Sequence, residues 1–342
     1  MPTSLPDMDY LAPETLARAL EMKSALGAEA MWLAGGTDLV LRARQRLVTP
    51  KAVISLKHLA GELGQVRQED GWLHLGAMLP LKQAALNPVV AQRLPGLKEA
   101  LLSIGAETLQ QRVGTIGGNL CLETRCIYYN QSAFFRSGLA PCFKLGGEVC
   151  HPGGETADRC RSVCQADGAV MLAALGARAV LASAQGRREL ELEEFYTGRG
   201  EAPLALTPEE LLVEVKLPLP GAGGGSAYEK LAWRSSLDYP QLSAAAALVL
   251  EDGLVREVRL ALGGAYAAPL LMKDAVGGLL GNAPEDEAID QAARKAGRHA
   301  EVFFIENQSS PAAWRREVVP VAARRALERA LARAERQAED GS

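Results

Sequence analysis

Leu33-Ala34-Gly35-Gly36-Thr37-Asp38-Leu39 is the first of two glycine-rich turns in this chain, and Thr115-Ile116-Gly117-Gly118-Asn119-Leu120 is the second. A turn of this kind at a strand-to-helix junction exposes main-chain N–H groups and lets a phosphate approach the backbone closely. Neither turn matches the GxGxxG dinucleotide fingerprint or the GxxxxGK(S/T) phosphate loop. A single Gly-Gly turn is usually structural, whereas two of them could hold the two phosphates of one dinucleotide between them.

The residues around the first turn predict a small β-α-β unit. Residues 31–33 indicate a short buried strand that runs into the turn. Thr37 or Asp38 can cap a helix over residues 39–46, and residues 51–56 indicate the next strand.

The rest of the chain indicates a mixture of helices and strands. Up to residue 220 we predict helices over 13–27, 80–85, 95–104 and 168–176, a hairpin over 64–78 that turns at 69–71, and strands over 178–183, 187–192 and 208–218. Residues 221–226 (GAGGGS) indicate a flexible loop or linker. Beyond them we predict antiparallel strands over 227–234, 241–251 and 254–263, then helical segments over 270–280, 285–303 and 318–337. The fold class is therefore α+β, with one domain over residues 1–220 and a second over residues 227–337.

The composition is that of a globular protein that does not bind nucleic acid. The 342 residues are 48% hydrophobic, which is enough apolar material for two cores. The net charge is -4 and the pI is about 5.8, whereas nucleic-acid binding requires a basic footprint. The sequence shows no secretory signal pattern and no run near the ~20 apolar residues of a membrane helix. We therefore expect no membrane span and a cytoplasmic location.

All six cysteines lie between residues 121 and 164. In a reducing compartment, clustered cysteines are more often metal ligands than disulfide partners. Cys126, Cys142, Cys150 and Cys160 are separated by 15, 7 and 9 residues, in a long loop-like segment that a metal centre would tie down. Four thiolates suit a [4Fe-4S] cluster or a structural zinc ion. Zinc sites usually contain a CxxC pair, which this sequence lacks, but spacing alone leaves zinc as a serious alternative.

The two turns together resemble the FAD pyrophosphate motifs of the molybdenum hydroxylase flavoprotein family. The resemblance covers nearly the whole chain and includes PEELLVEVKLP at 208–218 and YEKLAWRSSLDYPQLSAAAAL at 228–248. It implies a two-subdomain FAD-binding domain of the PCMH/vanillyl-alcohol-oxidase type, followed by a smaller α+β domain whose antiparallel sheet packs on helices. The family's Arg-Asn pair before the second turn is replaced here by LQQRV at 109–113, which puts the local contacts there in doubt.

The resemblance also implies which residues contact FAD. They are the whole first turn, then Thr115, Gly117, Gly118 and Asn119 in the second, and beyond these Asp167, Leu212 (or its neighbour Val213) and Lys230. The C-terminal domain would approach the flavin near Lys230 and Asp238. Each residue after the second turn also has a plain structural interpretation, because Leu212 suits a core and the charged residues suit caps or surface pairs.

Residues 118–132 resemble the start of an insertion in the flavoprotein subunits of 4-hydroxybenzoyl-CoA reductases. Most family members lack this insertion. The resemblance implies that the insertion, at about 121–164, binds an extra [4Fe-4S] cluster through Cys126, Cys142, Cys150 and Cys160. Cys121 would then be a buried thiol beside the second turn, although spacing alone allows it to replace Cys126. Cys164 would be a core residue, and His151 a neighbour of the centre rather than a ligand.

The implied function is electron transfer within an oxidoreductase complex. The resemblance implies a large molybdopterin-binding subunit, a small [2Fe-2S] subunit, assembly as a dimer of heterotrimers and ferredoxin as external electron donor. We expect no catalytic acid, base or nucleophile in this chain. Two alternatives remain open: a flavin subunit of an aryl, aldehyde or xanthine-type hydroxylase that sends electrons outward, and a zinc-stapled scaffold protein without a redox role.

Overall fold

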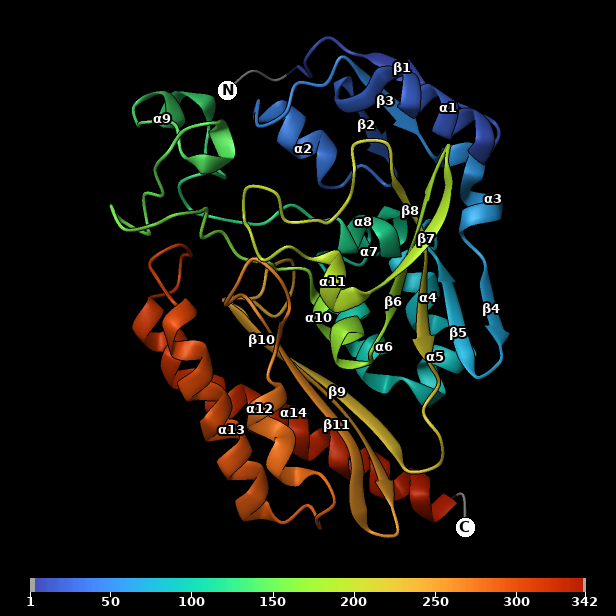
Figure 1. The fold of residues 1–342 in the computed structure, drawn as a ribbon, viewed down its shortest axis with the longest axis vertical. Helices are drawn as coiled ribbons and strands as arrows, with labels where there is room; N and C mark the ends of the chain where they lie inside the picture. Colours follow the sequence, from blue (N-terminus) through green and yellow to red (C-terminus); the bar gives the residue numbers. More distant parts are fainter. Residues whose placement is uncertain (1–3, 341–342) are drawn as a thin grey trace.

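The computed structural model describes residues 4–340 and contains three separate sheets within them. In Figure 1 the N-terminal sheet lies at one end of the molecule, a five-stranded sheet lies in the middle, and the C-terminal sheet lies at the other end with its helices. The fold is therefore the mixed helix and sheet arrangement that the sequence predicted. None of the described helices combines the length and apolar character needed to cross a membrane.

The N-terminal sheet confirms the predicted β-α-β unit. Its strands β1 (Asp9–Leu11), β3 (Ala52–Ser55) and β2 (Ala30–Leu33) are all parallel. Helix α1 (Leu16–Leu26) begins at Thr15, whose side chain accepts a hydrogen bond from the Arg18 N–H. Helix α2 (Leu39–Arg44) connects β2 to β3, and the first glycine turn is the link between β2 and α2.

The central sheet has the strand order β4-β5-β8-β6-β7, and every neighbouring pair is antiparallel. The strands are β4 (Val66–Glu69), β5 (Trp72–Gly76), β8 (Leu211–Pro218), β6 (Arg178–Ser183) and β7 (Gly186–Glu191). Asp70 and Gly71 both have positive φ, 49° and 80°, as a tight two-residue hairpin turn requires. The hairpin predicted over 64–78 is therefore confirmed.

Further short helices lie between residues 60 and 195, before and after the second turn. They are α3 (Ala60–Leu63), α4 (Leu81–Leu86), α5 (Pro88–Arg93), α6 (Pro95–Leu102), α7 (Gln110–Val113), α8 (Ile116–Leu120), α10 (Asp167–Ala174) and α11 (Leu192–Phe195). Helix α10 is buried along its whole length at the centre of the main core. Sequence reasoning missed α5, which begins at Pro88 with the Asn87 side chain as its cap.

The C-terminal sheet has the order β12-β11-β10-β9 and is accompanied by one short helix and two long ones. Its strands are β9 (Gly224–Leu231), β10 (Leu242–Glu251), β11 (Leu254–Gly263) and β12 (Leu270–Leu271). The helices are α12 (Lys273–Val276), α13 (Asp286–Ala300) and α14 (Ala312–Asp340). Helix α14 begins before the predicted residue 318 and contains Pro320, and the helical segment predicted over 270–280 begins with strand β12.

The prediction of a flexible linker over residues 221–226 was wrong for residues 224–226. Gly224, Gly225 and Ser226 belong to β9 and are buried. A Cβ atom on Gly225 would lie 2.0 Å from the Ala330 carbonyl oxygen of α14. Glycine is therefore required here because the helix lies directly on the strand backbone, and not because the chain is flexible.

The cysteine segment, residues 121–164, is largely irregular, as predicted. It contains one regular helix, α9 (Ala133–Ser137), and two isolated bridges, Arg125 with Val163 and Cys142 with Val149. Helix α9 lies beside α2, because the Arg136 side chain donates to the carbonyl oxygens of Gln45 and Arg46 (both 3.1 Å). The insertion is thus attached to the N-terminal sheet region near the first glycine turn.

Candidate functional site

The two glycine turns are brought together at the Gly35 backbone. A Cβ atom on Gly35 would lie 1.8 Å from the Val113 carbonyl oxygen and 3.1 Å from Gly114 Cα. Only glycine permits such a close approach of two main chains. The first turn therefore lies directly against the residues that lead into the second, although 78 positions separate Gly35 from Val113 (113 − 35).

The first turn presents free main-chain donors. Among the residues that the structure describes, no hydrogen bond within the chain involves the N–H groups of Gly35, Gly36, Thr37 and Asp38. The turn is half-buried, from Leu33 at the end of β2 to Leu39 at the start of α2, and Gly36 has a φ of 73°. Consecutive free N–H groups between a strand and a helix form a binding site for an anion such as a phosphate.

The second turn differs from the first because most of its N–H groups already have partners within the described chain, the Thr115 N–H excepted. It follows helix α7 rather than a strand, and it forms the short helix α8 with Thr115 as cap. The Gly117 N–H donates to the Ala77 carbonyl (2.8 Å), and the Gly118 N–H donates to the Thr115 hydroxyl (3.0 Å). The amides of Gly117 and Gly118 are therefore engaged within the chain, and contact of the second turn with the cofactor stays a prediction.

The second turn instead positions helix α10 and Asp167. The Asn119 carbonyl oxygen Oδ1 accepts a hydrogen bond from the Gly168 N–H at 3.0 Å. Asp167 is 3% exposed, and its carboxylate accepts a hydrogen bond from the Tyr228 hydroxyl (2.6 Å) and pairs with Lys230 (3.1 Å). Burial raises the pKa of Asp167, against the opposing effects of the Lys230 charge and the Tyr228 hydrogen bond.

The other residues predicted to contact the flavin lie in separate parts of the structure. Leu212 is buried in the main core, and its neighbour Val213 is buried in the core of the N-terminal region. Asp238 pairs with Arg234 at 3.4 Å in an exposed loop. The structure thus joins Asp167 and Lys230 but places Leu212 in a core, and the contact of each with the flavin stays a prediction.

Sequence reasoning missed a connected set of ion pairs between the first turn and the cysteine segment. Asp38 pairs with Arg125 and, at 3.6 Å, with Arg42. Arg42 pairs at 2.9 Å with Glu123, which also pairs with Lys144. Burial opposes ionisation of Glu123, but the charges of Lys144 and Arg42 outweigh it and hold the pKa of this carboxyl below its usual value. Asp38, predicted as a helix cap, makes no capping hydrogen bond.

The four predicted metal ligands line one small cavity. Cys126, Cys142, Cys150 and Cys160 surround it, together with aromatic residues that include Tyr128, Tyr129 and Phe143. A volume of about 10 Å³ is open inside, so a metal centre would require the cysteine side chains to turn or move apart. Of the two candidates for the first ligand, Cys126 lines the cavity and Cys121 does not, and a metal-binding role stays a prediction.

The two remaining cysteines pack in the main core. Cys164 is a buried member of this core, and Cys121 lies against its edge. Burial raises the pKa of each thiol to about 12, so neither is a ready nucleophile. Both positions agree with the structural roles that the sequence indicated.

The described residues contain no preformed metal site. Within residues 4–340, no three His, Cys, Asp or Glu side chains are grouped so that they could hold a metal ion. The [4Fe-4S] cluster expected from the sequence therefore stays a prediction. The Asn130 side chain accepts a hydrogen bond from the Cys126 N–H (2.9 Å), while its buried Nδ2 has no partner within the described chain.

His151 is a neighbour of the cavity, as predicted. Its Nε2 atom lies 2.9 Å from the Ala140 carbonyl oxygen, and its ring stacks on Tyr128 with 5.4 Å between the ring centres. These contacts hold the imidazole against the cavity wall.

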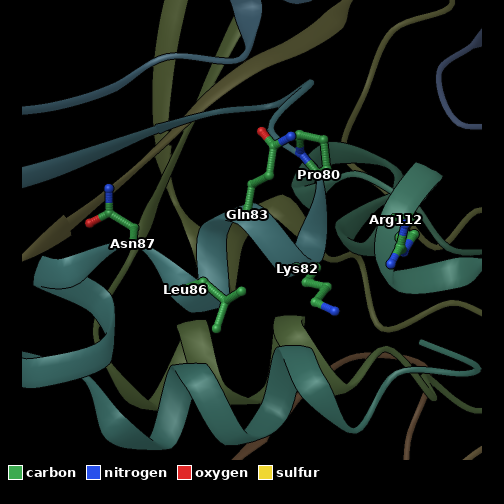
Figure 2. Close-up of a pocket in the computed structure, with 6 residues that line it drawn as sticks. All are labelled: Pro80, Lys82, Gln83, Leu86, Asn87 and Arg112. Carbon is green, nitrogen blue, oxygen red and sulfur yellow. The ribbon is translucent and has the colours of Figure 1, made fainter. Parts of the chain in front are cut away.

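A second hollow lies beside the second turn and was not predicted. Figure 2 shows its lining residues, which come from α4 with its two flanking residues and from α7: Pro80, Lys82, Gln83, Leu86, Asn87 and Arg112. Its volume is about 580 Å³, and Lys82 at its edge pairs with Glu107. Pro80 forms a bridge with Thr115, so the hollow adjoins the second turn without containing either glycine pair.

Comparison with known families decides the assignment. Residues 6–220 match the model of the FAD binding domain in molybdopterin dehydrogenase, and residues 226–330 match the CO dehydrogenase flavoprotein C-terminal domain. The chain belongs to this molybdopterin dehydrogenase flavoprotein family. It is accordingly an FAD-binding flavoprotein subunit of the oxidoreductase class. The free amides of the first turn fit the phosphate groups of that cofactor.

Individual members of the family are similar over most of the chain. The carbon monoxide dehydrogenase medium chain of Afipia carboxidovorans is 29% identical over 95% of this chain and 97% of its own length. The nicotinate dehydrogenase FAD-subunit of Eubacterium barkeri is 28% identical over 72% of this chain and 70% of its own. A solved structure of carbon monoxide dehydrogenase from Hydrogenophaga pseudoflava has a TM-score of 0.77 and 26% identity, covering 97% of this chain and 99% of that one.

Proposed function

We propose that this chain is an electron-transfer subunit that carries a [4Fe-4S] cluster in addition to FAD, similar to the flavoprotein subunit of a 4-hydroxybenzoyl-CoA reductase. The observation that carries the proposal is the convergence of Cys126, Cys142, Cys150 and Cys160 on one cavity. FAD exchanges two electrons together or one at a time, and an iron–sulfur cluster passes single electrons.

The preference for iron and sulfide over a single zinc ion rests on the spacing of the cysteines. All four candidate ligands are thiols, a set that suits a [4Fe-4S] cluster or a structural zinc ion. The sequence has no CxxC pair, which is the usual zinc pattern. The buried Asn130 amide beside Cys126 offers an N–H donor of the kind that tunes the sulfur atoms of such clusters. A zinc-stapled scaffold is the alternative from another class.

The residues of this chain have a holding role rather than a catalytic one. The amides of the first turn bind the cofactor phosphates, and Asn119 fixes the position of Asp167 and α10. The ion pairs of Asp38 and Glu123 hold the insertion against the first turn. Substrate chemistry would take place in a large molybdopterin-binding subunit. A small [2Fe-2S] subunit would pass electrons between that subunit and this chain. We propose assembly as a dimer of such heterotrimers in the cytoplasm, with ferredoxin as the donor.

A second candidate function within the family is supported by the names of the relatives. The carbon monoxide, nicotinate and caffeine enzymes are all called dehydrogenases, which take electrons from a substrate. On that pattern this subunit would send electrons outward to NAD or a quinone. Reduction of the co-purified complex by reduced ferredoxin, compared with reduction by NADH, separates the two directions.

The cluster is tested on the full chain produced anaerobically with iron supplied. We expect flavin and cluster absorption in the visible spectrum and a paramagnetic signal after reduction. We also expect about four iron atoms and about four acid-labile sulfides per chain. Cys142→Ser or Cys150→Ser should lose the iron and keep the flavin, whereas Cys164→Ser is the matched control and should keep both. A chain with flavin but no iron would contradict the cluster proposal, and a colourless chain with one zinc ion would favour the scaffold.

A further inference from the structure

A buried lysine stands beside the cysteine cavity. The Lys144 side chain is 3% exposed, and its ammonium group lies 5.0 Å from the ring centre of Tyr129, which lines the cavity. Lys144 directly follows Phe143, which also lines the cavity. The lysine charge therefore lies at the wall of the cavity.

The lysine charge is balanced by one carboxylate. Glu123 pairs with Lys144 through Oε1 and with Arg42 through Oε2, at 2.9 Å. Its side chain is 15% exposed and that of Arg42 is 11% exposed, so water screens these charges only weakly. Arg42 in turn pairs with Asp38 of the first turn. A continuous series of charges thus connects the phosphate-binding turn with the cavity wall.

We propose that Lys144 and Glu123 are positioning residues that set the redox potential of the metal centre held by the four cysteines. The inference rests on the proposed function, since it requires a redox-active centre in the cavity. It goes beyond that function because it names the charges that make the centre easier or harder to reduce.

The physical argument is electrostatic. Reduction adds one negative charge to the centre, and a fixed positive charge in a weakly screened site stabilises the reduced form. Lys144 therefore raises the potential, and Glu123 lowers it. Removal of one charge should shift the potential in one direction, removal of the other should shift it in the opposite direction, and removal of both should leave it near its original value.

The test is a redox titration of the cluster in the full anaerobic chain, followed by its paramagnetic signal. Lys144→Met should lower the midpoint potential, Glu123→Gln should raise it, and the double variant should lie between them. Lys144→Arg keeps the charge and should restore the wild-type value. The matched control is Lys51→Met, which breaks an exposed lysine–glutamate pair with Glu29 far along the surface and should leave the potential unchanged.

Iron content and flavin content are measured in every variant, so that loss of the cluster is distinguished from a shift in potential. If the Lys144→Met variant does not bind iron, the Glu123→Gln variant alone tests the inference. A midpoint potential of that variant equal to the wild-type value would overturn it. Shifts in the same direction for both single variants would also overturn it. A wild-type chain without iron would overturn the cluster proposal together with this inference, whereas a cluster with unmoved potentials would overturn this inference only.

Discussion

At the scale of single residues, Gly35 determines whether the two turns can meet. Its missing side chain allows the Val113 carbonyl to lie where a Cβ atom would be, at 1.8 Å. Its own N–H group is one of the four free donors of the first turn. The close contact with Val113 is a physical reason for glycine at this position, and the free N–H group is available for the predicted phosphate contact.

Substitution of Gly35 by alanine should separate the turns. We expect Gly35→Ala to lower the free energy of unfolding by about 1–3 kcal/mol, as overpacking does in a filled site, and to reduce the amount of bound flavin. Chemical denaturation and the flavin-to-protein ratio measure the two effects. Gly61→Ala is the control, because a Cβ atom there meets nothing within 4 Å. Equal stability and flavin content in the two variants would contradict the close contact seen here.

At the scale of elements, strand β9 and helix α14 show how a glycine run became part of a sheet. Ser226 and Gly225 of β9 pair with β10, and α14 lies on them so closely that Gly225 has no room for a side chain. Alanine residues of α14 face the strand, including Ala330 and Ala334. Small residues on both surfaces bring the helix axis near the sheet and exclude water from the contact.

Gly225→Ala should therefore weaken the packing of α14 on β9. A Cβ atom at this position would lie 2.0 Å from a helix carbonyl oxygen, so the helix must move outward. We expect a loss of about 1–3 kcal/mol in the free energy of unfolding, measured by urea denaturation. Gly221→Ala, four residues earlier and in open space, provides the comparison and should change stability by less than about 0.5 kcal/mol.

At the scale of the whole molecule, charged contacts join the FAD-binding region to the C-terminal region. Glu99 on α6 pairs with Arg329 and Arg333 on α14 and accepts a hydrogen bond from the Tyr228 N–H at 3.2 Å. The contact of Asp167 with Lys230 crosses the same boundary. Asp167 and Lys230, which are predicted to contact the flavin, are thus held by elements from both regions, so their positions depend on how the two regions pack.

The Glu99 contacts predict a pH dependence of stability. Burial raises the pKa of Glu99, but its hydrogen bonds to Arg333 and Tyr228 and the two arginine charges prevail, so this pKa lies below the usual 4.5. The folded state therefore favours the ionised form, and the resulting stability is present above pH 4.5 and is lost as the pH falls through the lowered pKa.

Glu99→Gln should remove this contribution. We expect a loss of about 1 kcal/mol at neutral pH, a modest value because the side chain is 29% exposed to solvent, and no difference from wild type once the pH is below the lowered pKa. Urea denaturation from neutral pH down to about pH 3 measures the difference. Glu251→Gln, in an exposed pair with Arg256, should behave as wild type throughout. A stability difference that persists unchanged at the acidic end would refute the assignment.

Local patterns in the sequence were sufficient for most elements and for the choice of family. Alternating and helical spacing predicted β4, β5, α1 and α10, because these patterns depend on neighbours within a few residues. The clustering of cysteines identified a candidate centre for the same reason. Errors arose where a distant segment decides the outcome, as in the glycine run of β9, which is a strand because α14 covers it.

The sequence by itself determined that this chain is an FAD-binding flavoprotein with four well-spaced thiols in an insertion, since both features are written in short stretches of residues. Only the tertiary structure decided which amides are free to bind a phosphate, that Cys126 and not Cys121 faces the other three thiols, and that Lys144, Glu123 and Arg42 connect the cavity to the first turn. These properties depend on contacts between residues far apart in the chain, which no local pattern records.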